Sequence, residues 1–330
     1  MSSPTKDTEE PEWLKLLQEH ANFDDKNITC IIETILIRYL LSNDEEAAAT
    51  TATKYDAIYS EVYEPNFNGY AGTKKGWSGY LSLFYGTLFR IVDLIPYDDP
   101  TQDKIVKLVV ELKKLPTHAC KIWNKAEFEW VDSLVWAREP ILAWELLKQE
   151  EMYPPHDEGL DWSDPSEVHD YEEGATAWVN YHAFAARCVA AGLNSGFKHR
   201  FDNPAMAIAL GLDADYRPAY KKLDCHVMAA TQYLTIAADV IDAECVRKQL
   251  PPNRHHDWTG WADGKGPAVW KRWGDRLKEI AEAIEGGGEL GFRLQDKNKE
   301  VVKDLVMRAR QKMVALEPEL FAEKKTEAEE

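Results

Sequence analysis

Apolar residues recur at a spacing of three and four along almost the whole chain, and this pattern limits the possible folds more than any other feature. Residues at positions i, i+3, i+4 and i+7 share one face of an α-helix, whereas a half-buried strand alternates apolar and polar residues. No segment alternates convincingly. The sequence therefore predicts an all-α fold, an irregular multi-helix bundle of roughly ten helices with no significant sheet.

Prolines and acidic residues mark many ends of the segments that carry this spacing. The predicted helices cover residues 11–22, 28–41, 44–62, 77–95, 98–115, 131–151, 175–191, 223–248, 267–284 and 297–316. The segment 28–41 is apolar on nearly all sides, which is typical of a central, buried helix. Pro140 is expected to kink or break the helix at 131–151, because proline removes a backbone donor.

The distribution of polar residues predicts where the folded region begins and ends. Residues 1–10 and the acidic tail at 317–330 are expected to be disordered. Residues 11–316 form a single predicted helical domain. Within it, residues 153–173 contain three prolines, many acids and few aliphatic side chains. We expect a loop or linker there, which is the best candidate for a sub-boundary or a lid.

The charge balance bears on the partners of the protein. The 330 residues include 57 acidic and 39 basic side chains, which gives a formal net charge of −18. Affinity for nucleic-acid phosphates comes mainly from clustered Lys and Arg, so we expect no nucleic-acid partner. The acids are concentrated in residues 1–10, 153–173 and 317–330, where they favour solubility more than recognition.

Targeting features and cysteine usage predict a cytoplasmic protein with no membrane partner. The polar N-terminus has no apolar signal region. The most apolar run, 28–41, contains Glu33 and Arg38 and is too short to span a bilayer. The five cysteines are odd in number and no pair has C-x-x-C spacing, which is typical of free thiols in a reducing compartment. The sequence does not specify an oligomeric state.

Four blocks of the sequence, in order along the chain, resemble one protein family. They are residues 76–116, which contain IPYDDPTQDKIVKLVVELKKLP, and residues 178–187, 223–234 and 270–276. These blocks are similar to the fungal domain-of-unknown-function family 3632 (DUF3632). The resemblance implies a fungal source and a helical fold. It implies no established activity for the family as a whole, and so it transfers no catalytic residues.

The acidic motif DDPTQD at residues 98–103 is a candidate metal site. Class I terpene synthases use such carboxylates to bind magnesium, because hard cations take oxygen ligands. Pro100 places this motif at the start of a helix, where acids are also favoured by the helix dipole. We therefore interpret the acids as helix-capping residues and predict no metal site.

The helix predicted at 175–191 carries the first candidate catalytic residues. Asn180, Phe184 and Arg187 lie at i, i+4 and i+7, hence on one face. As a pocket wall, Arg187 would clamp an anionic or carbonyl group while Asn180 orients it. Alternatively, the two residues are structural, with Arg187 bound to helix C-terminal carbonyls or to an acid on a neighbouring helix.

His226, in the helix predicted at 223–248, is the third candidate catalytic residue, as a general acid or base. The alternative is a core histidine with satisfied hydrogen bonds. If the two helices pack together, Asn180, Arg187 and His226 converge with Tyr233. The predicted substrate-binding residues are the aromatic side chains that we expect to line a pocket: Trp178, Tyr181, Phe184, Tyr233, Trp77 and Phe84.

We interpret the chain as a small-molecule-transforming enzyme that uses no cofactor, a cyclase, isomerase or pericyclase-like protein of fungal specialised metabolism. Its expected partner is a small apolar organic substrate in an aromatic-lined helical pocket, where positioning supplies much of the rate. One alternative is a non-enzymatic helical interaction or scaffold protein whose grooves hold a partner. Another is an atypical magnesium-dependent enzyme similar to class I terpene synthases. An enclosed cavity lined by Trp and Tyr would favour the first.

Overall fold

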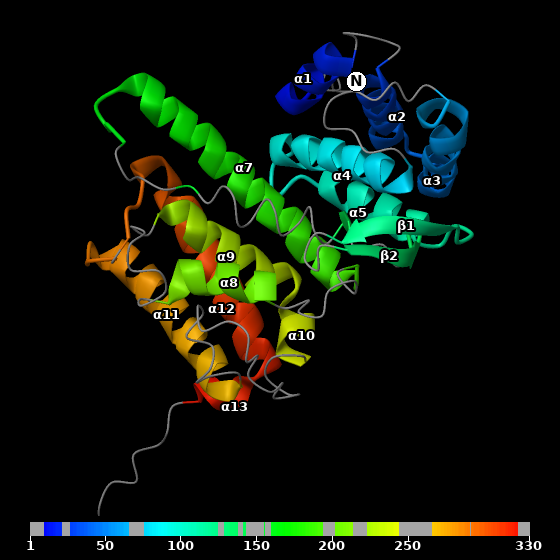
Figure 1. Cartoon of the computed structure of the whole chain (residues 1–330). Coiled ribbons are helices and arrows are strands. Elements are labelled where there is room, and N and C mark those ends of the chain that lie inside the picture. The colour runs from blue at the N-terminus through cyan, green and yellow to red at the C-terminus, as the bar shows by residue number, and fades with distance from the viewer. Residues whose placement is uncertain are drawn as a thin grey trace, which may run out of the picture. The chain divides into compact units, whose positions relative to one another are not determined.

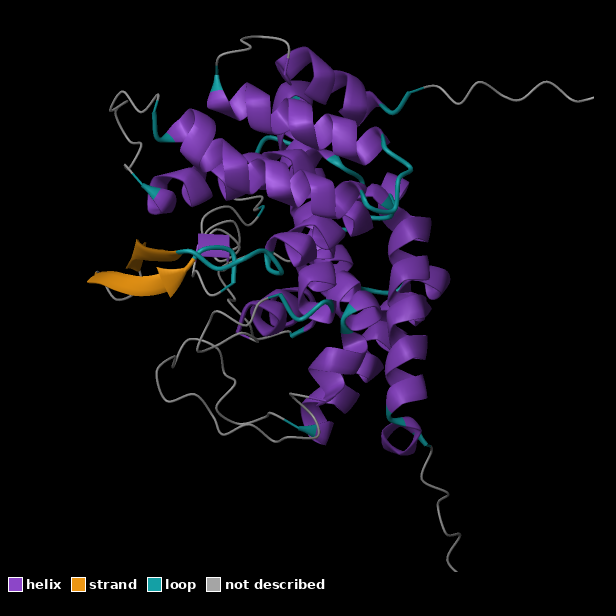
Figure 2. Ribbon diagram, turned by 90° about the vertical axis from the view of Figure 1, so that its right-hand side faces the viewer, coloured by secondary structure: helices purple, strands orange, loops and turns teal. Residues whose placement is uncertain are grey.

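The computed structural model describes residues 10–21, 27–65, 76–124, 129–137, 141–142, 155, 160–193, 202–213, 223–243, 266–290 and 292–322. The chain divides into two compact units, Met1–Leu146 and Leu147–Glu330. Helices make up nearly all of the regular structure in the described residues, as Figures 1 and 2 show. The prediction of an all-α, irregular helical bundle is confirmed.

The first unit contains five α-helices, a π-helical turn and one hairpin within its described residues. These elements are α1 (Glu12–Ala21), α2 (Ile28–Leu41), α3 (Ala47–Ile58), η1 (Tyr59–Tyr63), α4 (Trp77–Leu94), α5 (Thr101–Leu112), β1 (Ala119–Asn124) and β2 (Glu129–Leu134). Residues Tyr80, Leu81, Phe84 and Phe89 of α4 are completely buried. The centre of this unit is therefore α4, whereas α2, which we expected to be central, leaves Arg38 and Leu41 exposed.

The acidic motif ahead of α5 is a capping structure. The carboxylate of Asp99 accepts a hydrogen bond of 2.8 Å from the backbone N–H of Thr101 and one of 3.3 Å from the indole of Trp13. Asx side chains just before a helix bind its first free N–H groups in this way. Across the described part of the chain, no three His, Cys, Asp or Glu side chains gather closely enough to hold a metal ion.

The prediction of a helix at 131–151 is wrong for its first part. Strands β1 and β2 pair antiparallel, with Ala119 opposite Leu134 and Asn124 opposite Glu129, and they form the small sheet that Figure 2 colours orange. The two strands contain aromatic and β-branched residues, which favour extended backbone, and helical spacing alone is a weak guide over so short a segment. Residues 141–142 are helical, and 143–151 lie outside the described residues.

The second unit packs its helices around α9. Its elements are α7 (Pro165–Ala190), α8 (Asp202–Leu212), α9 (Asp224–Ile236), α10 (Ala238–Ile241), α11 (Pro267–Gly286), η4 (Asp296–Asn298), α12 (Lys299–Leu316) and α13 (Pro318–Phe321). Every residue of α9 from Asp224 to Leu234 is buried. Helices α7, α8 and α12 contact α9, an arrangement visible in Figure 1. A helix enclosed by three others has no solvent face, which explains its weak amphipathicity.

Several boundaries in this unit differ from the sequence predictions. Helix α7 begins at Pro165, so 165–173 is not the predicted loop; Asp164 accepts a hydrogen bond from the backbone of Ser166, and Pro165 fits the first helical turn. Helix α8 was not among the predicted helices. The helix predicted at 223–248 is interrupted at Ala237 between α9 and α10. Residues 318–321, within the tail expected to be disordered, form α13.

The cysteines in the described part of the chain form no disulfide. They are Cys30, Cys120, Cys188 and Cys225, and all but Cys120 are buried. Among the described helices, none combines the length and the apolar character that a membrane crossing requires.

Candidate functional site

A cluster of buried aromatic and histidine side chains lies between α7 and α9. Trp178 and His182 are one helical turn apart on α7, and their ring centroids are 4.3 Å apart. Helix α9 contributes His226, whose ring meets the Trp178 ring edge-on at 5.7 Å, and Tyr233, whose ring centroid is 5.6 Å from that of His182. All four side chains are at most 5% exposed. The two helices therefore bring four polar rings into a water-poor interior.

His182 is the centre of this cluster. Its Nδ1 atom shares a hydrogen bond of 3.1 Å with the hydroxyl of Tyr233. Its pKa is lowered to about 3, first because burial disfavours the charged ring and second because His226 lies nearby. The imidazole is therefore neutral at physiological pH, with one ring nitrogen as a donor and the other as an acceptor.

Two nitrogen atoms in the cluster have no hydrogen-bond partner among the described residues. They are Nε2 of His182 and Nε1 of Trp178, and both are buried. An unpaired buried polar atom costs about 1–3 kcal/mol, and native proteins contain few of them. Two such atoms on neighbouring rings make this interface the candidate site.

His226, which the sequence predicted as a catalytic residue, binds the backbone. Its Nε2 atom lies 2.9 Å from the carbonyl oxygen of Pro155. Because a carbonyl oxygen only accepts hydrogen bonds, this ring nitrogen carries a proton. The geometry fits the alternative of a core histidine, and His226 adds a ring to the wall of the cluster.

Asn180 and Arg187 lie on a different side of α7 from the cluster. Helical geometry of 100° per residue puts both about 180° around the helix from Trp178 and His182, which face α9. Arg187 is half-buried, and one of its guanidinium N–H groups donates to the carbonyl of Ala183 at 3.2 Å. This contact fits the structural alternative for Arg187. Helical geometry thus argues against the predicted convergence of these residues with His226.

The remaining predicted residues of α7 divide between the two sides. Tyr181 is buried and its ring centroid lies 4.9 Å from that of His182, so it borders the cluster. Phe184 is completely buried, and helical geometry groups it with Asn180 and Arg187. Sequence reasoning passed over His182 itself. The signal that could have found it is the stripe formed by Tyr171, Trp178 and His182, which share one helix face.

The start of α9 is fixed by Asp224, a buried carboxylate. It accepts hydrogen bonds from the backbone N–H groups of Cys225 at 2.9 Å and Gln295 at 3.0 Å, and from the amide of Asn298 at 2.9 Å. These bonds tie α9 to the segment that leads into α12. They also hold the first turn of α9, and with it His226, in place relative to α7.

The same end of the α7–α9 interface contains a thiol and a phenol. Tyr171 Oη lies 3.8 Å from Cys225 Sγ. Burial, followed by the charge of Asp224, raises the pKa of the Cys225 thiol well above its usual range. A thiol that keeps its proton is a poor nucleophile. This part of the interface therefore provides packing, and the nitrogen atoms without a described partner lie at the His182 end.

Comparison with protein families identifies the family of the chain. Residues 85–277, more than half of the chain, match a family described as "Protein of unknown function (DUF3632)". The chain belongs to this family. The DUF3632 match spans α7, α8 and α9 and hence the whole cluster around His182. Comparison with curated proteins and with solved structures gives no match.

The other two predicted substrate-binding residues, Trp77 and Phe84, precede the DUF3632 match and belong to the first unit. Trp77 stacks on Tyr59 with ring centroids 3.8 Å apart and lies nearly parallel to His118 at 5.9 Å. Phe84 meets the edge of the Trp136 ring at 5.2 Å. The predicted aromatic set is therefore distributed over two separate clusters, one in each unit.

Trp136 holds the cluster of the first unit together despite an unfavourable backbone. Its φ is 62°, and the N–H of Ala137 donates to the carbonyl of Val135 at 2.7 Å, which makes a strained γ-turn. The indole is buried and donates to Asp56 at 2.8 Å, and Asp56 also contacts Nε2 of His118 at 3.2 Å. Burial of the largest side chain and this hydrogen bond offset the strain.

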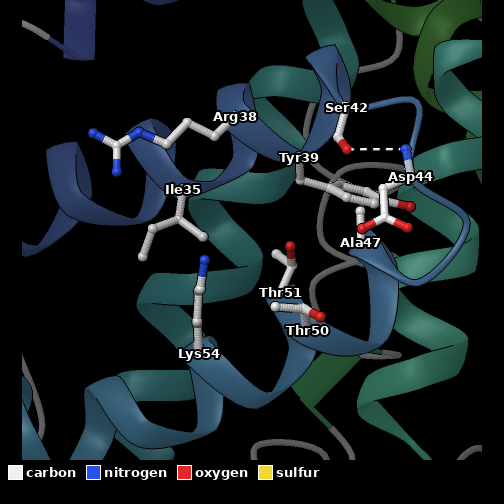
Figure 3. Close-up of a pocket in the computed structure, with 9 residues that line it drawn as sticks. All are labelled: Ile35, Arg38, Tyr39, Ser42, Asp44, Ala47, Thr50, Thr51 and Lys54. Atoms are coloured by element: carbon white, nitrogen blue, oxygen red, sulfur yellow. Dashed lines mark hydrogen bonds between the residues drawn. The ribbon is translucent and has the colours of Figure 1, made fainter.

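A pocket of about 390 Å³ lies between α2 and α3, also ahead of the DUF3632 match (Figure 3). Its lining residues are Ile35, Arg38, Tyr39, Ser42, Asp44, Ala47, Thr50, Thr51 and Lys54. None of the predicted substrate-binding residues is among them. This pocket mixes polar and apolar side chains, with Tyr39 as its one aromatic residue, and so differs from the aromatic pocket that the sequence predicted.

Proposed function

We propose that this DUF3632 protein is a small-molecule-transforming enzyme, of cyclase or isomerase type, that needs no cofactor and has its active site at the His182–Tyr233 pair. The observation that carries the proposal is the neutral, buried His182, whose Nδ1 binds Tyr233 and whose Nε2 has no partner among the described residues. Perturbed titratable groups in buried positions are typical of catalytic sites.

The hydrogen bond to Tyr233 sets what Nε2 of His182 does. When Tyr233 donates its proton to Nδ1, the ring proton is on Nε2, which then donates a hydrogen bond to a substrate. When Nδ1 donates to the Tyr233 oxygen, Nε2 presents its lone pair and accepts a hydrogen bond. The pair thus supplies either a hydrogen-bond donor for developing negative charge or an acceptor that orients a substrate N–H or O–H group, since a ring with a pKa near 3 is a weak base.

The surroundings favour an apolar substrate. Trp178, Tyr181 and His226 place ring faces and edges around His182, and the indole Nε1 of Trp178 adds a second donor. Apolar walls with a few placed polar groups are the usual composition of small-molecule sites. In such an interior, binding a flexible substrate in a reactive conformation contributes much of the rate.

The metabolic role and the cellular compartment that we propose rest on the family and on the state of the cysteines. The resemblance to a family of fungal proteins supports a role in the specialised metabolism of a fungus. The buried cysteines Cys30, Cys188 and Cys225 form no disulfide, which supports a reducing, cytoplasmic compartment.

The test uses the full chain and a library of small apolar polyenes and carbonyl compounds, with conversion followed by liquid chromatography and mass spectrometry. We expect conversion of at least one compound, and a loss of about 100-fold or more in kcat for His182→Gln and Tyr233→Phe. Tyr55→Phe is the matched control, because it removes a buried hydroxyl that binds the Ile32 carbonyl at 2.8 Å in the first unit.

Two results would contradict the proposal. One is a folded His182→Gln variant with full turnover, which would place the chemistry elsewhere. The other is the absence of both conversion and binding across the library, with binding followed through the quenching of tryptophan fluorescence. The second result would favour the interaction-protein alternative.

A further inference from the structure

The pocket between α2 and α3 is lined by matching stripes from the two helices. Ile35, Arg38, Tyr39 and Ser42 occupy positions i, i+3, i+4 and i+7 on α2 and just beyond its end. Ala47, Thr50, Thr51 and Lys54 repeat the same spacing on α3. Each stripe is one helix face, so the pocket is the groove between two facing helices.

The groove stays open because of the residues on α3. A packed helix pair places large aliphatic side chains at these positions, whereas Ala47, Thr50 and Thr51 are small. The hydroxyls of the two threonines also give this face hydrogen-bonding groups. The result is a cavity of about 390 Å³ with a mixed polar and apolar lining, in a space that larger side chains would fill.

Two cations at one end of the pocket have no ion-pair or hydrogen-bond partner among the described residues. They are Arg38 and Lys54. Two other basic residues of this unit are engaged: Arg90 binds Glu33 at 2.8 Å, and Lys104 binds the carbonyl oxygen of Leu40 at 2.7 Å. In a chain of net charge −18, two cations without an acid beside a pocket indicate an attraction for an anion.

The opposite end of the pocket carries a carboxylate, that of Asp44, instead of cations. Ser42 Oγ accepts a hydrogen bond from the N–H of Asp44 at 3.1 Å, the dashed line in Figure 3, and Asp44 accepts one from Glu46 at 3.0 Å. Figure 3 also shows the Lys54 amino group on the Ile35 side of the pocket and Asp44 on the Ala47 side. Seven residues of helix separate Ala47 from Lys54, a length of about 10 Å.

We propose that this pocket binds a small polar metabolite with an anionic group, a carboxylate or a phosphate, at the Arg38–Lys54 end and hydroxyl or amino groups at the Asp44 end. Arg38 extends outward in Figure 3, and rotation of its long side chain brings the guanidinium onto a bound anion. Tyr39 forms a wall, since its hydroxyl already donates to the Lys104 carbonyl at 2.7 Å.

This site does not rest on the proposed function. Its residues lie in the first unit and precede the DUF3632 match, whereas His182 and Tyr233 lie in the second unit and within the match. Each site is therefore tested by variants that leave the other unchanged.

The experiment is isothermal titration calorimetry of the full chain with four probes: inorganic phosphate, glycerol 3-phosphate, glycerate and glycerol. We expect binding of the anions and not of glycerol, with glycerol 3-phosphate tighter than phosphate because its hydroxyls reach the Asp44 end. Preference for glycerol 3-phosphate over glycerate assigns a phosphate ligand, and the reverse assigns a carboxylate. Binding of the anions is expected to weaken with added salt.

Variants distinguish anion binding in the pocket from a general effect of the charge of the protein. Lys54→Gln and Arg38→Gln are each expected to weaken anion binding about tenfold, the loss of one charge-assisted hydrogen bond. Lys15→Gln, on α1, makes the same charge change outside the pocket and is expected to have no effect. Thr50→Leu fills the groove and is expected to abolish binding while circular dichroism stays unchanged.

Two outcomes would overturn the proposal. The first is the absence of binding heat for all three anions in the millimolar range at low salt. The second is anion binding that Lys54→Gln, Arg38→Gln and Thr50→Leu leave as tight as in the parent protein.

Discussion

Nδ1 of His182 on α7 and the hydroxyl of Tyr233 on α9 share a hydrogen bond of 3.1 Å between side chains that are at most 1% exposed. The two residues are 51 positions apart in the chain. Packing of α7 against α9 is therefore what creates the pair, and the same packing keeps the imidazole neutral by excluding water. Stability, protonation and proposed chemistry all depend on this one interface.

The lowered pKa of His182 predicts a pH dependence of folding stability. An unfolded histidine takes up its proton near pH 6.5, whereas folded His182 does so only near pH 3. Between these values the unfolded chain binds the proton and the folded chain does not, so stability falls as the pH drops below about 6.5. His182→Gln is expected to reduce this slope by up to about 1.4 kcal/mol per pH unit. Urea unfolding between pH 4.5 and 7.5 measures it.

The control for this measurement is His169→Gln, because His169 lies on the same helix with an exposed side chain. Its replacement should leave the slope as it is. A His182→Gln variant with the full slope of the parent protein would show that His182 titrates normally in the folded state.

Replacement of Gly211 tests the close approach of α8 to α9. A Cβ atom at this position would collide with the backbone carbonyl of His226 and with Cβ of Ala230, neither of which is a flexible side-chain end. Gly211→Ala is therefore expected to destabilise the fold by about 1–3 kcal/mol, although alanine normally favours a helix over glycine by about 1 kcal/mol. The free energy of unfolding in urea provides the comparison.

Gly174→Ala is the matched control. Gly174 lies within α7, and a Cβ there would meet nothing within 4 Å. The control should gain up to about 1 kcal/mol of stability from helix propensity alone. Equal effects of the two replacements would mean that α8 and α9 are not held as closely as the structure has them.

Local signals were sufficient for much of the fold. Helix α2 has the predicted ends because Asn27 caps its start, and α4 follows a strong apolar face from Trp77. Such signals lie within a few residues of the element that they define. Strands β1 and β2 were missed because a hairpin depends on pairing across the turn, which a search for helical spacing does not detect.

The site was less predictable than the fold. Candidates on α7 were chosen by residue type, which pointed to Asn180 and Arg187, whereas the interface with α9 is formed by the stripe of Trp178 and His182. Which face of a helix meets a particular neighbour depends on the packing of the whole unit. The pocket between α2 and α3 was not anticipated for a similar reason, since it results from small residues on α3 where this helix faces α2.

Asp99 tests the interpretation of the acidic motif. Its carboxylate accepts hydrogen bonds from Thr101 and Trp13, so Asp99→Ala should cost about 1 kcal/mol of stability. Asp98→Ala, at an exposed neighbouring position, should cost less than about 0.5 kcal/mol. Thermal unfolding with and without millimolar Mg²⁺ is the measurement, and a stabilisation by Mg²⁺ that either variant abolishes would revive the terpene-synthase alternative.

Asp224 makes the strongest prediction for stability. Asp224→Ala would leave the donors of Cys225, Gln295 and Asn298 without their acceptor, the first in a buried and the other two in a partly buried position. Each unpaired donor costs about 1 kcal/mol or more, so the total loss is expected to be roughly 3 kcal/mol. Asp239→Ala removes an exposed carboxylate that pairs with Lys312, and it should cost less than about 1 kcal/mol. Unfolding in urea compares the two variants. A small loss for Asp224→Ala would mean that α9 keeps its position without the link to the start of α12, and His226 would then need another anchor.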